Sequence, residues 1–179
     1  MKIYTKMGDQ GSSRLFSGKE VSKNSPFLRT YGDVDELNSI LGIVLKYNQD
    51  QEIETILLDL QKKLFVLGAD LATPLDSKKK INRIEEGDIL ELEAFIDQFE
   101  KELTPITKFI LPGGHPIASQ VHFARTVTRR AETMVILLSE KENVNAECKK
   151  YLNRLSDLLF VLARIINKRN GITDVFWKQ

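Results

Sequence analysis

The side chains best suited to bind an anion lie close together near the start of the chain. Between Lys6 and Arg14 the sequence places two glycines and two serines beside these two cations, after a short β-prone segment at residues 3–5. Glycine permits positive φ and lets a ligand approach the backbone amides, while turn N–H groups and hydroxyls can form an anion-binding nest. The pattern predicts a polyphosphate ligand. The alternative is an ordinary Gly/Ser turn that binds nothing.

This loop is not a P-loop. That motif needs a glycine five residues before a Gly-Lys pair, with Ser or Thr directly after the pair. Ahead of Gly18-Lys19 this place holds Ser13, and Glu20 follows the pair. A nucleotide would therefore have to bind in another way. Lys23, in a polar segment that we expect to be a loop (residues 18–29), is either a second phosphate ligand or a solvated lysine.

A second polar group lies on one face of a helix predicted at residues 116–140. Four of its side chains project within roughly 80° of one another, at about 100° per residue. They are His122, Arg125, Arg129 and Glu132, and Arg130 adds a third arginine. Arginine offers planar, bidentate donors that suit a triphosphate or a buried ion pair, and Glu132 could orient Arg129 or hold Mg²⁺. A phosphate-binding face and a structural salt-bridge network both remain open.

An apolar segment that contains Phe109 runs into Pro112-Gly113-Gly114. Such a rigid, hydrophobic loop predicts either the lining of a pocket or a tight connection between two helices. Pro116 suits the first turn of the helix that follows.

Helices must position these groups. Apolar residues recur at helical spacing in five segments. The first predicted helix opens at residues 31–38 and reaches at least residue 45. The other four lie at about 51–72, 86–103, 116–140 and 146–170. Asp33 and Glu36 have capping-box spacing in the first of them. Asp35, on another face, either assists that helix N-terminus electrostatically or meets a cation across an interface. Five long helices and almost no strand pattern predict an all-α, five-helix up-and-down bundle.

The 179 residues suit one domain, with an N-terminal loop region (1–30), a helical bundle (31–170) and a C-terminal tail (171–179). The tail ends in aromatic residues, which we expect to dock on their own subunit or on a neighbour.

The composition excludes several classes of function. A net charge of +1 gives no reason to expect nucleic acid or an anionic membrane as a partner. No apolar run is long enough for a transmembrane helix or a signal peptide. A single cysteine, Cys148, fits a reducing cytoplasm, and together with two histidines it does not make a zinc site. No Glu-x-x-His pair occurs, which disfavours a di-iron bundle.

Five blocks of the sequence, in order, carry a family resemblance. They are Tyr4–Gly11 (YTKMGDQG), Tyr31–Asn38 (YGDVDELN), Leu111–Gly114 (LPGG), Ala124–Glu132 (ARTVTRRAE) and Tyr151–Phe160 (YLNRLSDLLF). Together they closely resemble the PduO-type ATP:cob(I)alamin adenosyltransferases, over nearly the whole chain.

The resemblance implies a homotrimer of five-helix bundles with active sites at the subunit interfaces. It implies that the Co(I) centre of a reduced corrinoid attacks the 5′ carbon of ATP, which forms adenosylcobalamin and releases triphosphate. The cofactors and substrates implied are ATP, Mg²⁺ and cob(II)/cob(I)alamin. The implied partners are a flavoprotein corrinoid reductase and an adenosylcobalamin-dependent client enzyme.

Matched positions imply the site residues. Those expected to contact ATP are Thr5, Lys6, Met7, Gly8, Ser13, Arg14, Lys23, Arg129, Arg130, Glu132 and Asn153. Glu132 is also the candidate ligand of Mg²⁺. Asp35 and Arg125 are expected to pair across the interface. Phe109 is expected to lie beneath the corrin, where a hydrophobic side chain keeps the lower axial ligand from cobalt and eases reduction of Co(II).

The sequence departs from the family pattern at Ser12-Ser13, at Asn24-Ser25 after the loop lysine, and at His115 after Pro-Gly-Gly. The first two changes bear on ATP affinity and the third on the corrin side. Two rival functions remain: another ATP-dependent transferase on a helical bundle, and a non-catalytic corrinoid- or ATP-binding carrier.

Overall fold

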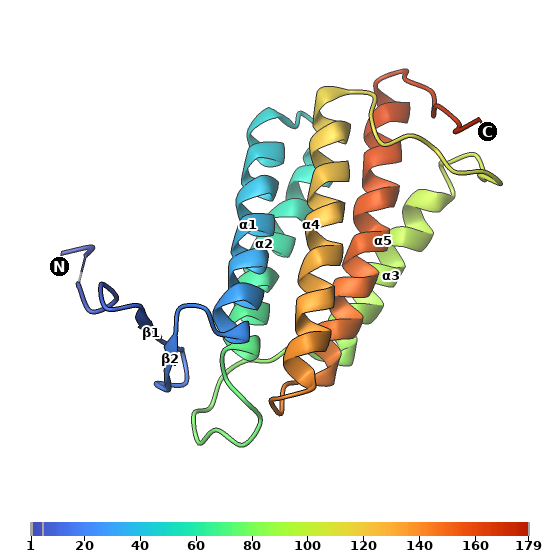
Figure 1. Cartoon of the computed structure of the whole chain (residues 1–179). Coiled ribbons are helices and arrows are strands. Elements are labelled where there is room, and N and C mark those ends of the chain that lie inside the picture. The colour runs from blue at the N-terminus through green and yellow to red at the C-terminus, as the bar shows by residue number, and fades with distance from the viewer. Residues whose placement is uncertain (1, 5, 179) are drawn as a thin grey trace.

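A computed structural model describes residues 2–4 and 6–178 of the chain. In these residues the expected all-α architecture is confirmed: five long helices lie side by side, and a small hairpin lies at one end of the bundle (Figure 1). The elements are β1 (Ser12–Arg14), β2 (Glu20–Ser22), α1 (Pro26–Tyr47), α2 (Gln51–Leu71), α3 (Glu86–Glu100), α4 (Pro116–Ser139) and α5 (Ala146–Arg169).

Local sequence explains where most helices begin and end. The Asp50 carboxylate accepts hydrogen bonds from the N–H groups of Glu52 and Ile53 at the start of α2, and Asn145 does the same for Glu147 at the start of α5. Such caps satisfy backbone donors that have no partner inside the helix. Beyond the last turn of α5, Gly171 takes a positive φ of 71°, which suits a helix C-terminus.

The first helix begins earlier than the sequence suggested. Its N-cap is Ser25, whose hydroxyl accepts from Leu28 N–H, and Pro26 occupies the first turn. The Ser-Pro pair that marked a loop is therefore a helix start, because proline at the first helical position loses no hydrogen bond. The proposed capping box of Asp33 and Glu36 is wrong, since both lie well inside α1 and bind Arg130 instead.

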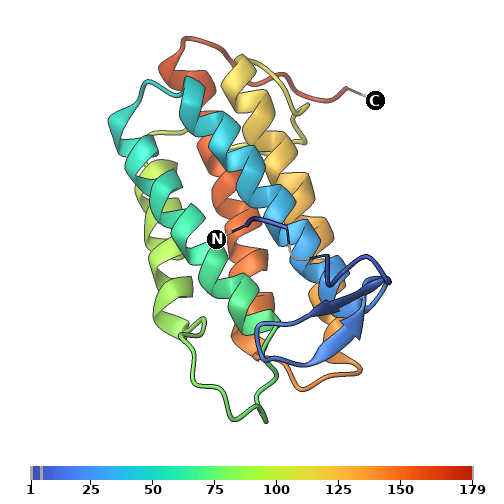
Figure 2. The ribbon, with the colours of Figure 1, turned by 90° about the vertical axis from the view of Figure 1, so that its left-hand side faces the viewer.

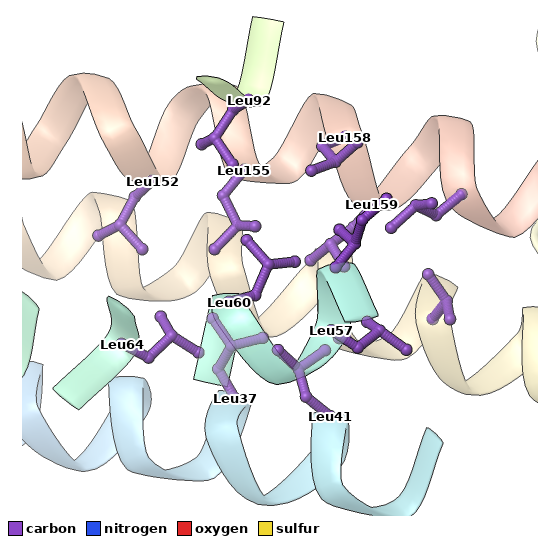
Figure 3. Packing of buried hydrophobic residues seen from close by; sticks show 14 of the residues in the cluster. Leu37, Leu41, Leu57, Leu60, Leu64, Leu92, Leu152, Leu155, Leu158 and Leu159 are labelled. Carbon is purple, nitrogen blue, oxygen red and sulfur yellow. The ribbon is translucent and has the colours of Figure 1, made fainter. Parts of the chain in front are cut away.

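Leucines from four helices form the centre of the core (Figure 3). The residues labelled there come from α1 (Leu37, Leu41), α2 (Leu57, Leu60, Leu64), α3 (Leu92) and α5 (Leu152, Leu155, Leu158, Leu159). In the bundle α4 packs between α1 and α5, α2 packs on α1, and α3 packs on α5. Burial of these apolar stripes, and not helix propensity alone, stabilises the helices.

The hairpin was not expected, because strands of three residues are too short to show a periodic pattern. β1 and β2 pair antiparallel, with Ser13 opposite Val21. The hairpin rests on the bundle through a second cluster of buried residues, made of Leu15, Phe27, Ala72 and Leu138. The β-prone residues Ile3 and Tyr4 do not form a strand, and Thr5 lies outside the described residues. None of the helices described is both long enough and apolar enough to cross a membrane.

Candidate functional site

In the N-terminal loop, the side chain of Lys23 lies against Gly8. A Cβ placed on Gly8 would lie 3.0 Å from Nζ of Lys23, so a larger residue would require the lysine side chain to shift. Backbone hydrogen bonds close the loop: Lys23 N–H donates to Gly11 O at 2.8 Å, and Gly11 N–H donates to Gly8 O at 3.2 Å. The structure therefore places Lys23 within the glycine loop. The local sequence had left open whether this residue is a phosphate ligand or a solvated lysine.

The backbone of the same loop is strained at Lys6. Its φ is +60°, the only positive φ of a described non-glycine residue, and such conformations cluster at ligand-binding sites. Of the other expected ATP contacts here, Met7 and Arg14 are exposed, and Ser13 is half-buried in β1. Thr5 lies outside the described residues.

A second set of expected site residues lies on the neighbouring helices α4 and α5, on what we call the α4/α5 face (Arg125, Arg129, Glu132 and Asn153). Asn153 donates from its amide nitrogen to Oε1 of Glu132 at 3.1 Å, which joins the two helices beside Arg129. Arg125, one turn before Arg129, is half-buried, and its Nε has no partner among the described residues. Burial lowers the pKa of the Arg125 guanidinium, and the positive charge of Arg129 lowers it further. This α4/α5 face holds uncompensated positive charge and suits an anion.

Arg130 faces the other neighbour of α4. It donates from Nε to Asp33 at 2.9 Å and also pairs with Glu36, both on α1. The hydrogen bond to Asp33 is the main reason that the pKa of Arg130 is raised. In the described chain this expected ATP ligand ties α1 to α4.

His122 belongs to the polar face of α4, but the sequence assigned it no separate role. Its side chain is buried, its ring lies 6.1 Å from that of Phe160 on α5, and neither ring nitrogen has a partner among the described residues. Burial lowers the pKa of His122, as does the nearby charge of Arg125, while Asp174 opposes them. The neutral imidazole is therefore favoured next to Arg125.

The segment between α3 and α4, which carries Phe109, lies at the opposite end of the bundle from the hairpin (Figure 1). The Phe109 side chain is 80% exposed. Residues 107–109 and 176–178 together line an open groove, so the aromatic side chains of Phe176 and Trp177 stand beside Phe109. The tail thus docks on its own subunit, one of the two outcomes expected for its aromatics. The sequence did not reveal that Phe109 would be its partner.

The Pro-Gly-Gly turn beyond Phe109 is held by a residue that the sequence analysis missed. Buried Asn167 on α5 accepts from His115 N–H at 2.8 Å and donates to Gly113 O at 2.9 Å. Gly114 has φ +104°, and a Cβ there would collide with the Asn167 side chain. His115, a departure from the family pattern, caps α4 by accepting from Ile117 N–H.

Within one chain, the N-terminal loop and the expected site residues of α4 and α5 lie on different parts of the bundle. The hairpin and the segment before it lie in front of α1 and α2 when the bundle is turned, while α4 and α5 form the other side (Figure 2). Asp35 shares its face of α1 with Tyr31, one turn earlier, and Tyr31 packs against Gly68 of α2. Arg125 belongs to α4. Asp35 is exposed and makes no ion pair within the described chain.

The family model described as cobalamin adenosyltransferase matches residues 3–166. The corrinoid adenosyltransferase of Bacillus subtilis is 41% identical over 183 residues, covering 100% of this chain and 93% of that protein. The corrinoid adenosyltransferase PduO of Salmonella typhimurium is 41% identical over 165 residues, covering 92% of this chain and 49% of that protein.

A solved structure is also closely similar. It is a variant PduO-type ATP:corrinoid adenosyltransferase from Lactobacillus reuteri complexed with cobalamin and ATP. The TM-score is 0.95 at 38% sequence identity, and the match covers 99% of this chain and 97% of that one.

Proposed function

The chain belongs to the cobalamin adenosyltransferase family, and we propose that it joins the 5′ carbon of ATP to the Co(I) centre of a reduced corrinoid and releases triphosphate. It is a corrinoid adenosyltransferase, an enzyme whose substrates are ATP and cobalamin. The bond from the 5′ carbon to the α-phosphate oxygen breaks as the carbon–cobalt bond forms, with both electrons supplied by Co(I).

The observation that carries the proposal is the set of side chains on the α4/α5 face. Because the nucleophile belongs to the corrinoid substrate, the protein has to bind, orient and stabilise charge. The leaving triphosphate is strongly anionic, and preorganised cations lower the energy of developing negative charge. Arg129 and the half-buried Arg125 supply such charge, and the hydrogen-bonded pair of Glu132 and Asn153 lies beside them.

The N-terminal loop is the second part of the ATP site in this proposal. Lys23 over Gly8 and the strained backbone at Lys6 form a compact cationic loop. Backbone amides and lysines of this kind suit phosphate oxygens. The roles of Thr5, Met7, Ser13, Arg14 and Arg130 in ATP binding are part of the same proposal, and Arg130 would have to share its guanidinium with Asp33 and Glu36.

Mg²⁺ fits at Glu132. The described residues contain no group of three or more His, Cys, Asp or Glu side chains that could hold a metal alone. Mg²⁺ with a nucleotide usually takes only one or two carboxylates, together with phosphate oxygens and waters. Glu132 offers one carboxylate oriented by Asn153. A bound Mg²⁺ would neutralise part of the triphosphate charge.

The corrinoid is proposed to lie against Phe109. An exposed apolar ring at this place offers the corrin a hydrophobic contact and leaves no protein ligand for the lower face of cobalt. Loss of the lower axial ligand makes Co(II) easier to reduce. The exposed aromatics Phe176 and Trp177 extend the same apolar surface.

A homotrimer with interface sites is proposed because one chain keeps the two halves of the ATP site apart. The N-terminal loop lies in front of α1 and α2, while α4 and α5 form the other side of the bundle (Figure 2). Asp35 belongs to α1, and Arg125 and Arg129 belong to α4. A neighbouring copy could bring its Asp35 carboxylate to Arg125, whose buried Nε lacks a partner in the described chain. A flavoprotein reductase and an adenosylcobalamin-dependent client enzyme would act before and after this step. The buried free thiol of Cys148 suits a reducing cytoplasm.

The reaction is tested anaerobically. Chemically reduced cobalamin is mixed with the protein and MgATP, the corrinoid spectrum is followed, and triphosphate is assayed. Adenosylcobalamin and triphosphate produced one for one support the proposal. ATP-dependent binding without product would favour the carrier, and release of ADP or diphosphate without a corrinoid would favour a different transferase.

A further inference from the structure

The C-terminal tail forms a short antiparallel pair with the segment that carries Phe109. Leu111 N–H donates to Val175 O at 2.8 Å, and Trp177 N–H donates to Phe109 O at 2.8 Å. Ile110 lies opposite Phe176 in this pairing. Two strands of such length are marginal by themselves in water, so the tail needs another attachment to stay in place.

Arg164 of α5 provides that attachment. Its Nε donates to the Asp174 carboxylate at 2.8 Å, and its Nη2 donates to Thr104 O at 2.7 Å. The Arg164 side chain is only 6% exposed and that of Asp174 only 17%. One buried guanidinium therefore holds both the start of the tail pairing and the start of the segment that leads to Phe109.

We propose that Arg164 and Asp174 are positioning residues for the corrinoid half of the reaction: their ion pair holds the tail against the Phe109 segment and so fixes the aromatic surface that meets the corrin. This inference rests on the proposed function of Phe109. Neither residue has to touch a substrate for this role, because the pair acts through the backbone of the two segments that it joins.

The physical reason lies in the cost of leaving one member alone. A buried guanidinium keeps its charge, and removing the partner of a buried ion pair is strongly destabilising because the remaining charge is uncompensated. The tail can relieve that cost by leaving the bundle, which lets water reach Arg164. Phe109 O and Leu111 N–H would then lose their partners, and Phe109 would lose its fixed position. The N-terminal loop lies at the other end of the bundle (Figure 1) and would not be disturbed.

The chain carries its own reporter of this event. Trp177 is the only tryptophan in the sequence and lies in the tail pairing. Its fluorescence anisotropy and its quenching by acrylamide report whether the tail is docked, without any enzymatic assay. The variants are Asp174→Asn, Arg164→Gln and the two combined.

Arg169→Gln is the matched control. Arg169 lies on the same helix and binds three carboxylates, Asp50 at 2.6 Å, Glu52 at 2.9 Å and Glu102 at 2.6 Å. Among the described residues, its side chain makes no hydrogen bond or ion pair to the tail or to residues 109–111. Arg169→Gln should therefore lower the unfolding free energy, as any loss of a charged network would. It should not cause a loss of tail docking.

In Asp174→Asn we expect lower Trp177 anisotropy, stronger quenching, and a fall of roughly tenfold or more in kcat/KM for the corrinoid, with KM for ATP within about twofold of the wild type. The double variant should be no worse than Asp174→Asn, because it no longer leaves an unpaired cation. If the wild type is active, the inference would be overturned by unchanged Trp177 anisotropy and quenching in Asp174→Asn. It would also be overturned by equal losses of kcat/KM for ATP and for the corrinoid. An inactive wild type would overturn the proposed function first, and this inference with it.

Discussion

Asn153 on α5 donates a hydrogen bond of 3.1 Å to the carboxylate of Glu132 on α4. The two residues are 21 positions apart in the sequence, and the bond joins the two helices of the α4/α5 face. It also leaves the second carboxylate oxygen of Glu132 available for a ligand, because the described structure gives that oxygen no bond.

Glu132→Gln should lower kcat/KM for MgATP by roughly tenfold or more, because a carboxylate that orients Arg129 or binds Mg²⁺ is replaced by a neutral amide. Steady-state kinetics at varied Mg²⁺ measure this. Glu140→Gln, at the exposed C-cap of the same helix, is the control and should change nothing. If the two variants behaved alike, Glu132 would have no part in ATP binding.

Asp35→Asn and Arg125→Ala should each lower turnover by roughly tenfold or more, because either change leaves an interface charge unpaired. The unfolding free energy of Asp35→Asn should stay within about 0.5 kcal/mol of the wild type, since the side chain is exposed. Denaturant unfolding and turnover, measured on the same preparations, test both statements.

Mixing these two variants tests where the pair lies. If Asp35 and Arg125 come from different subunits, co-refolded equal amounts of Asp35→Asn and Arg125→Ala should regain about a quarter of wild-type sites, as random assembly of a cyclic oligomer gives. If both residues served one subunit, no intact site could form. Absence of recovery in a correctly assembled mixture would therefore count against the interface pair.

Phe109→Ala should impair reduction and adenosylation of the corrinoid more than ATP binding. The ring is 80% exposed, so its loss should hardly change stability, while the corrin loses its apolar contact. The measurements are the Co(II) reduction rate with the protein and ATP present, and ATP affinity by calorimetry. Leu90→Ala removes another exposed apolar side chain, on α3, and should affect neither. Equal turnover in Phe109→Ala would remove this residue from the mechanism.

Gly114→Ala should destabilise the protein by roughly 1–3 kcal/mol, the usual cost of a strained backbone with a steric conflict. The residue has φ +104°, and a Cβ would collide with Asn167, which holds Gly113 and His115. Gly87→Ala in α3 is the control. It has free space around it and should be neutral or stabilising by up to about 1 kcal/mol. Urea unfolding of both variants makes the comparison.

His122 predicts a pH dependence of stability. Its pKa in the folded chain lies below the ordinary 6.5, first because of burial and second because of Arg125, with Asp174 acting in the opposite sense. Below about pH 6.5 the unfolded chain therefore binds a proton that the folded chain does not, so this contribution to stability is present above that pH and lost as the pH falls.

His122→Leu should remove this dependence, and the difference in unfolding free energy between wild type and variant should vary with pH below about 6.5 but not above it. His115→Gln is the control, because His115 is the other histidine and lies at the N-cap of α4. If the difference between wild type and His122→Leu did not vary with pH, the pKa of His122 would be the same in the folded and unfolded chains.

Several residues show how far the sequence could lead. The spacing of Arg125, Arg129 and Glu132 predicted a shared helix face, because helix geometry alone relates them. The structure bears out that face, with Asn153 brought to it by the packing of α5 on α4. By contrast, the start of α1 was missed because Ser25-Pro26 is equally compatible with a loop and with a helix N-terminus.

The all-α class, the approximate helix ranges and, through the motif blocks, the family and its chemistry could be predicted from the sequence. These depend on local periodicity and on residue identities that can be read along one chain. The remaining features required the folded structure: Lys23 lies against Gly8, Arg130 binds Asp33 and Glu36, the tail pairs with the Phe109 segment, and the N-terminal loop lies on the other side of the bundle from α4 and α5. Such contacts join residues distant in sequence, and they follow from how the buried apolar faces pack together, which no local pattern records.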